Sequence, residues 1–129
     1  MRSVATIALS VAMMAGIVVP ALGSPEGVWE FKTKDTRVAV EMCGDGRALC
    51  GTLVWLKDTT YNEKYEPFLG TLMVDKAEPS GPGRWQGEMN FFGQKASGTI
   101  TQSGEDQISI RGCVMLVLCK TYQLYRYKD

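Results

Sequence analysis

The sequence has no histidine among its 129 residues, and this absence removes several kinds of chemistry. Cys/His zinc sites, Ser–His and Cys–His nucleophile pairs and acid–base catalysis by histidine all need an imidazole. The sequence also has no excess of positive or negative charge, because 14 basic side chains balance 14 acidic ones. It contains no run of basic residues that would indicate a surface for binding a phosphate backbone. We therefore expect no nucleic-acid partner.

The N-terminal segment has the pattern of a secretory signal peptide. Arg2 supplies a positive charge, residues 4–19 form an apolar run, and the small residues Ala21 and Gly23 precede Ser24. This pattern predicts cleavage after Gly23 and export to the periplasm or beyond. The alternative is an uncleaved anchor, because the apolar run is near the lower length limit for spanning a bilayer.

We therefore expect a signal peptide over residues 1–23 and one domain over residues 24–129, with no membrane span after cleavage. A chain of this length supports a single hydrophobic core and leaves no room for a second domain. No cysteine lies at the predicted cleavage site, which argues against a lipid anchor.

Four cysteines, Cys43, Cys50, Cys113 and Cys119, are expected to form disulfides because export places them in an oxidising compartment. Three pairings are possible, and chain entropy alone favours a long bridge. Geometry favours local pairs, since Cys43 ends one predicted strand and Cys50 begins the next across a Gly-rich turn. Cys113 and Cys119 repeat this arrangement. We predict the bridges Cys43–Cys50 and Cys113–Cys119.

Other uses of these cysteines fit the spacing less well. Neither pair is a C-x-x-C motif and neither has an obvious helix N-terminus to lower a thiol pKa, so structural bridges are favoured over redox pairs. A zinc site of four thiolates stays formally possible, but the cysteine spacings are wider than zinc sites usually show. We expect no metal and no cofactor.

The chain is expected to be almost entirely β-structure. No long stretch shows helical spacing without glycine, whereas short alternating runs recur between turn residues. The candidate strands are residues 27–33, 36–42, 51–56, 69–74, 84–91, 96–102, 107–112 and 120–127. The candidate connections between them are residues 34–35, 44–46, 57–68, 78–83, 92–94 and 103–105.

Eight antiparallel strands joined mainly by hairpins can close into an up-and-down barrel, which removes the exposed edges of an open sheet. The predicted fold class is thus all-β, a single eight-stranded antiparallel barrel with two local disulfides. A sandwich of two sheets is the competing architecture, and the pattern of strands alone does not exclude it.

Several motifs together resemble a family of secreted bacterial proteins known as domain of unknown function 2147. They are G-x-W at Gly27 and Trp29, the block CGDGRALCGTLVWL at residues 43–56, W-x-G at Trp85 and Gly87, and R-G-C at residues 111–113. The resemblance spans nearly all of the chain after the predicted signal. It implies a small lipocalin-like barrel, exported from the cytoplasm, and it implies no catalytic residue.

Trp29 and Arg126 are expected to form a structural lock. In proteins with lipocalin architecture, an early tryptophan packs near the base of the barrel and a late-strand arginine lies across its ring. Such a cation–π contact contributes about 0.5 to 2 kcal/mol. We interpret the pair as a lock between the first and last strands rather than as a ligand contact.

The candidate ligand-binding residues are large apolar side chains on the candidate inward faces. Ile108 and Ile110 also lie on these faces. An eight-stranded barrel either fills itself with side chains or holds one small ligand, and both readings remain open. The predicted ligand-binding set is Leu53, Trp55, Met89, Phe91, Tyr122 and Leu124.

The leading hypothesis is a non-enzymatic exported barrel that binds a small, partly apolar molecule in the cell envelope. The alternative is an envelope or stress-related interaction protein that acts through its outer surface, with Tyr61, Tyr65 and Tyr125 among its contacts. A hydrolase is a distant third. The carboxylates of the longest loop could serve such an activity, although loops also carry solvated charge; they are Asp58, Glu63 and Glu66.

Overall fold

The computed structural model describes residues 23–58, 63–115 and 117–128. Residues 1–22, which carry nearly all of the predicted signal peptide, lie outside this part, so the signal stays a prediction. The described chain contains eight strands and one short 3₁₀ helix. They are β1 (Gly27–Phe31), β2 (Thr36–Cys43), β3 (Ala48–Leu56), η1 (Glu66–Phe68), β4 (Leu72–Gly81), β5 (Arg84–Phe91), β6 (Gln94–Gly104), β7 (Gln107–Val114) and β8 (Leu118–Arg126).

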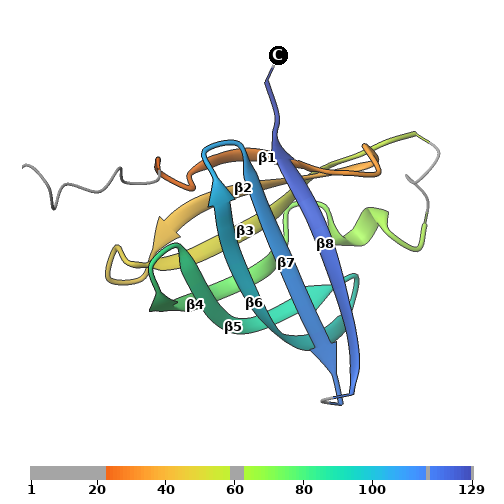
Figure 1. The fold of residues 1–129 in the computed structure, drawn as a ribbon. Helices are drawn as coiled ribbons and strands as arrows, with labels where there is room; N and C mark the ends of the chain where they lie inside the picture. The colour runs from red at the N-terminus through yellow and green to blue at the C-terminus, as the bar shows by residue number, and fades with distance from the viewer. Residues whose placement is uncertain (1–22, 59–62, 116, 129) are drawn as a thin grey trace, which may run out of the picture.

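The strands form a closed antiparallel barrel in which each strand pairs with its neighbours in sequence (Figure 1). Closure comes from β1, where Trp29 lies opposite Val38 of β2 on one side and opposite Arg126 of β8 on the other. The predicted barrel is therefore confirmed, and the two-sheet sandwich is excluded. Closure pairs the two strands that would otherwise be the exposed edges of the sheet.

Side chains that alternate inward along the strands fill the centre of the barrel. The largest of them are less than 2% exposed: Trp29, Leu49, Leu53, Met89, Ile100, Ile108 and Leu124. Gly98 belongs to this packing, because a Cβ atom built there would collide with the Met89 sulfur. The centre of the barrel is thus a packed core, one of the two readings that the sequence left open.

A β-bulge in β3 reverses the predicted direction of Trp55. Arg37 lies opposite Trp55 and the next residue, Val38, lies opposite Leu53, so Val54 is an extra residue in β3. Leu53 and Leu56 are buried, Val54 is exposed and Trp55 is half-buried beside Arg37. The expectation that Trp55 shares the inward face of Leu53 was wrong, because simple alternation does not continue through a bulge.

Strand β4 is longer than the sequence suggested, and the predicted loop over residues 78–83 is mostly strand. The pairing of β4 with β5 is irregular between Val74 and Glu78, and Lys76 adopts a left-handed φ of 52°. This irregularity bends the strand and allows it to continue past Pro79, which lies opposite Trp85 near the strand end. The loop was predicted from its prolines and glycines, which are tolerated here by the irregular pairing.

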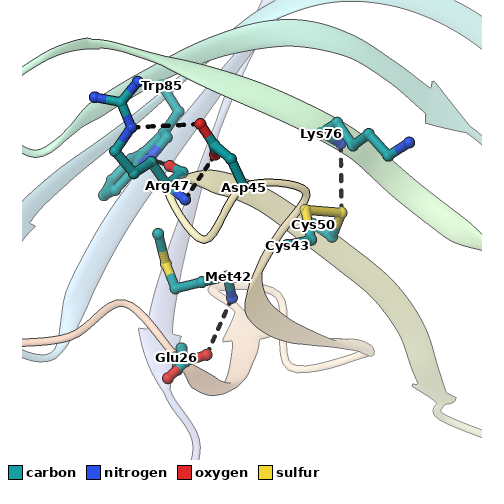
Figure 2. Close-up of a disulfide and its surroundings, with 8 residues drawn as sticks. All are labelled: Glu26, Met42, Cys43, Asp45, Arg47, Cys50, Lys76 and Trp85. Atoms are coloured by element: carbon teal, nitrogen blue, oxygen red, sulfur yellow. Dashed lines mark hydrogen bonds and ion pairs between the residues drawn. A yellow bond between two sulfur atoms is a disulfide. The ribbon is translucent and has the colours of Figure 1, made fainter.

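Both predicted disulfides are present, Cys43–Cys50 and Cys113–Cys119. In the first, the Cα atoms are 5.9 Å apart, and Figure 2 shows this bridge beside the β2–β3 turn. The backbone N–H of Lys76 on β4 donates to the Cys50 sulfur over 3.4 Å. Disulfides of this kind indicate an oxidising environment outside the cytoplasm.

The β2–β3 turn is further fixed by contacts on its other side (Figure 2). Asp45 accepts a hydrogen bond from the Arg47 backbone N–H at 3.0 Å, and the Trp85 indole N–H donates to the Arg47 carbonyl at 3.1 Å. The backbone hydrogen bond from Arg47 lowers the pKa of Asp45 from its usual value. The turn is therefore held by the disulfide on one side and by the hydrogen bonds of Asp45 and Arg47 on the other.

Arg126 ties the N-terminal segment to the end of the barrel where β6 turns into β7. Its guanidinium lies 4.4 Å from the centre of the Trp29 ring. The same group donates hydrogen bonds to the carbonyls of Glu26 at 2.7 Å, Ser24 at 2.9 Å and Glu105 at 2.8 Å. This cluster lies at the end of the barrel where β1 begins and β8 ends.

Candidate functional site

The opposite end of the barrel is hollowed, and we call this hollow the mouth. The β5–β6 and β7–β8 turns lie at this end, because alternate turns of an up-and-down barrel share an end. The cavity has a volume of about 440 Å³, which lies within the ~300–1,000 Å³ range of small-molecule sites. The mouth is the candidate functional site.

The mouth is the continuation of the inward face of β8 beyond the packed core. Alternate residues along this face become progressively exposed: Leu124 is fully buried, Tyr122 is half-buried, and Lys120 and Leu118 are exposed. All of these except Leu124 line the cavity. The strand therefore places an aromatic ring, a cation and an aliphatic side chain in sequence from the core to the rim.

The floor of the mouth is aromatic. The rings of Phe91 and Tyr122 have their centres 5.5 Å apart, and Tyr122 also lies 5.4 Å from Phe31, which anchors it to the core. Phe91 lies against the backbone of Gly112, where a Cβ atom would be 3.1 Å from the ring. The small residues Gly112 and Ala96 complete the floor. This packing places an apolar surface of two mutually tilted rings at the base of the cavity.

The rim adds aliphatic side chains and one cation. Val114, Val117 and Leu118 line one side, and Lys120 and Gln94 supply polar groups. None of the described residues that line the mouth is acidic. The arrangement suits a molecule with an apolar body against the rings and an anionic group beside Lys120.

The Cys113–Cys119 disulfide fixes the β7–β8 hairpin at the edge of the mouth. The two cysteines lie directly opposite each other in the pairing of β7 with β8, and Val114 lies opposite Leu118 at the last pair before the turn. Cys119 itself lines the cavity. The bridge therefore holds two rim residues, Val114 and Leu118, at a fixed separation.

The predicted ligand-binding residues separate into three locations. Leu53, Met89 and Leu124 lie in the packed core. Phe91 and Tyr122 lie together on the floor of the mouth.

Trp55 lies outside the barrel. It contacts Arg37, whose guanidinium is 3.8 Å from the centre of the Trp55 ring and 3.8 Å from that of Tyr127. Arg37 also pairs with Glu30 at 2.8 Å. Trp55 is thus part of a stacked cluster on the outer surface and does not line the mouth.

Sequence reasoning missed Ala96, Gly112, Val114, Leu118 and Lys120 as mouth residues. The alternation of β8 contained a usable signal, because Lys120 and Leu118 are two and four positions before Tyr122 and share its face. Ala96 and Gly112 carried no such signal, since their part in the floor depends on which strands become neighbours.

The long loop between β3 and β4 packs onto the β5–β6 turn through aromatic rings. Phe92 lies 4.6 Å from Tyr65 and 5.9 Å from Phe68, measured between ring centres. Tyr61, the other candidate surface contact of this loop, lies outside the described residues. Tyr125 is 42% exposed on β8.

The carboxylates Asp58, Glu63 and Glu66 are all exposed. Within the described ranges, no group of three or more cysteine and acidic side chains is arranged to hold a metal ion. In the same part of the chain, no helix is long and apolar enough to cross a membrane.

The fold and the mouth define a small, disulfide-bridged, closed β-barrel with an apolar hollow at one end. Residues 27–126 match the model of a bacterial family described as uncharacterized, DUF2147, and the chain belongs to this family. No curated protein and no solved structure matches the chain. The resemblance noted from the motifs is confirmed.

Proposed function

We propose that this protein is an exported, non-enzymatic barrel that binds one small, partly apolar molecule at its mouth. The observation that carries the proposal is the cavity of about 440 Å³, with the Phe91 and Tyr122 rings on its floor. Because the core is packed, we propose a site at the open end of the barrel rather than in the interior, where the sequence predicted it. Phe91 and Tyr122 are the members of the original set that remain in the site.

The proposed ligand is an amphiphile with a short apolar chain and an anionic group. The apolar chain would cover the floor and the aliphatic rim, where burial is favourable by about 25 cal/mol per Å² of apolar surface. The anionic group would lie beside Lys120, because none of the described lining residues carries a negative charge that would pair with it. A periplasmic or secreted location, supported by the two disulfides, would give the site access to envelope molecules.

Binding is favoured over catalysis because the candidate catalytic carboxylates do not lie at the mouth. The loop carboxylates considered for a hydrolase, Asp58, Glu63 and Glu66, are exposed and are absent from the lining of the mouth. Assays across broad esterase and glycosidase panels test this part of the proposal, since sustained turnover by the purified protein would contradict it.

A matched pair of probes tests the mouth directly. Decanoate and decanol have the same chain length and differ in charge, so titration of both into ¹⁵N-labelled protein separates apolar from ionic recognition. We expect the largest amide shifts at Ala96, Gly112 and Lys120. Tyr122→Ser should weaken both probes about tenfold, because an aromatic contact surface is lost. Lys120→Gln should weaken decanoate alone.

Tyr125→Ser is the matched control, because Tyr125 lies on the same strand and is exposed outside the mouth. It should leave both affinities unchanged. Shifts spread evenly over the surface, or equal effects of the Tyr122 and Tyr125 substitutions, would contradict a site at the mouth.

A further inference from the structure

The tip of the β7–β8 hairpin exposes aliphatic side chains to an unusual degree. Met115 is 80% exposed, Val117 is 78% exposed and Leu118 is 66% exposed. The other exposed large hydrophobic residues of the described chain, Val54, Leu72 and Tyr125, reach only 44%, 43% and 42%. A cluster of this kind on a soluble domain marks a surface that contacts something apolar.

The tip is built to project. Figure 1 shows the β7–β8 hairpin extending beyond the other strands at the bottom of the view, away from the C-terminus. The Cys113–Cys119 bridge joins the two strands at the base of the tip. Met115 adopts a left-handed φ of 56°, a conformation that glycine adopts more readily. The turn therefore carries the large apolar side chain of Met115 at a position where the backbone conformation favours glycine.

The surroundings of the tip are basic. Lys120 follows the bridge on β8, and Arg111 precedes it on β7; both are exposed. Ser97 of β6 lies opposite Cys113, which places the exposed Lys95 two residues further toward the tip on the neighbouring strand. The sequence contains no acidic residue from position 107 to position 128. By strand register, Glu88 is the acidic residue of β5 level with the bridge, two strands away.

We infer that this tip docks on an anionic lipid surface, with Met115, Val117 and Leu118 inserted among the acyl chains and Lys95, Lys120 and Arg111 near the phosphate groups. Apolar side chains above a basic collar are the arrangement by which peripheral proteins bind the membrane interface. The inference is independent of ligand binding at the mouth, although Val117, Leu118 and Lys120 belong to both features.

The shape and chemistry of the tip argue against a protein partner. A stable protein interface buries about 1,200–2,000 Å² in total, far more than the end of a single hairpin presents. Protein interfaces also concentrate Trp, Tyr and Arg at their energetic centres, whereas the described residues at the end of this tip are aliphatic. A bilayer needs neither shape complementarity nor hydrogen-bond partners from such a tip.

Co-sedimentation with vesicles tests the inference, using the oxidised protein as purified. We expect binding to phosphatidylcholine vesicles that contain phosphatidylglycerol and weaker binding to phosphatidylcholine alone. Met115→Ser and Val117→Ser should each reduce partitioning about tenfold, because each removes one buried aliphatic side chain. Lys120→Glu should reduce it at least fivefold, and added salt should act in the same direction.

Two control variants match the substituted residues in kind. Leu72→Ser changes an exposed apolar residue on β4, and Lys76→Glu changes an exposed lysine on the same strand. Neither should alter partitioning. Circular dichroism and the mass of the oxidised chain check that each variant keeps its fold and both bridges.

Met115 and Tyr122 separate the two proposals, because Met115 does not line the mouth and Tyr122 does. Met115→Ser should lose vesicle binding and keep decanoate binding, and Tyr122→Ser should do the reverse. Absence of vesicle binding, or equal binding by wild type and Met115→Ser, would overturn the inference. Dimerisation that Met115→Ser abolishes, seen by sedimentation velocity without lipid, would also overturn it, since the tip would then cover a second copy.

Discussion

Replacement of Arg126 by methionine should destabilise the barrel by about 3 kcal/mol, because the guanidinium combines a cation–π contact with several hydrogen bonds. The group lies over Trp29 and donates to the carbonyls of Ser24, Glu26 and Glu105. We assign about 1 kcal/mol to the ring contact and about 2 kcal/mol to the hydrogen bonds together. The value for the hydrogen bonds is kept low because water can replace arginine as the donor to carbonyls near the surface.

Urea denaturation, followed by circular dichroism, measures this change as a shift in the midpoint at constant slope. Arg126→Lys should lose about 2 kcal/mol, since lysine keeps the charge but not the planar fork that reaches separate carbonyls. Amide exchange of residues 26–28 should accelerate more than exchange in β5, because Arg126 holds the N-terminal segment directly.

Lys128→Met is the matched control. Arg126 also pairs with Asp106, at 3.2 Å, and Lys128 pairs with the same carboxylate at 3.2 Å. The Lys128 side chain is 68% exposed, so its loss should change stability by less than about 0.5 kcal/mol. A loss below about 1 kcal/mol for Arg126→Met, or an equal loss for the two variants, would refute the assignment of the lock to Arg126.

Three further predictions follow from the described contacts. Cys113→Ser with Cys119→Ser should lower stability by about 2 kcal/mol through the entropy of the short loop, and urea midpoints measure it; an unchanged midpoint would contradict this. Leu124→Ala should lower stability by about 3 kcal/mol, because Leu124 is fully buried; a loss under about 1 kcal/mol would show that the core is loosely packed. Asp45 should titrate below its usual pKa in an NMR pH series, since the Arg47 backbone N–H donates to its carboxylate. Its contribution to stability is therefore present above the unfolded pKa and lost as the pH falls through the folded value; an ordinary pKa would contradict the hydrogen bond.

The fold was largely predictable from the sequence because its determinants are local. Alternating runs separated by turn residues identified all eight strands, and hairpin connections implied neighbours in sequence order. The disulfides followed from the same reasoning, since Cys43 and Cys113 each end a strand whose hairpin partner begins near the second cysteine.

The errors fall where the backbone departs from regular pairing. Trp55 was assigned to the inward face because alternation was carried through the strand, and the bulge at Val54 reverses it. The extension of β4 past Pro79 was missed because proline and glycine usually mark a loop, and only the irregular pairing with β5 tolerates them in a strand. Both features depend on a partner strand and are invisible in a single segment.

Only part of the candidate site was predictable, for a similar reason. Phe91 and Tyr122 were selected as large inward side chains, which their own strands determine. Whether such a side chain lies in the core or at the mouth depends on how far each strand extends beyond its neighbours. Lys120 lay outside the predicted set, which held only large apolar side chains, although an inward face near an open end meets solvent and can carry a charge.

Native mass spectrometry of protein purified from its own compartment, with disulfides intact, tests ligand binding at the mouth most directly. We expect a bound species of defined mass that is retained by Tyr125→Ser and lost from Tyr122→Ser, and organic extraction would then identify its class. A bare oxidised mass for the wild type under gentle conditions, together with no response to decanoate or decanol, would contradict a ligand site at the mouth.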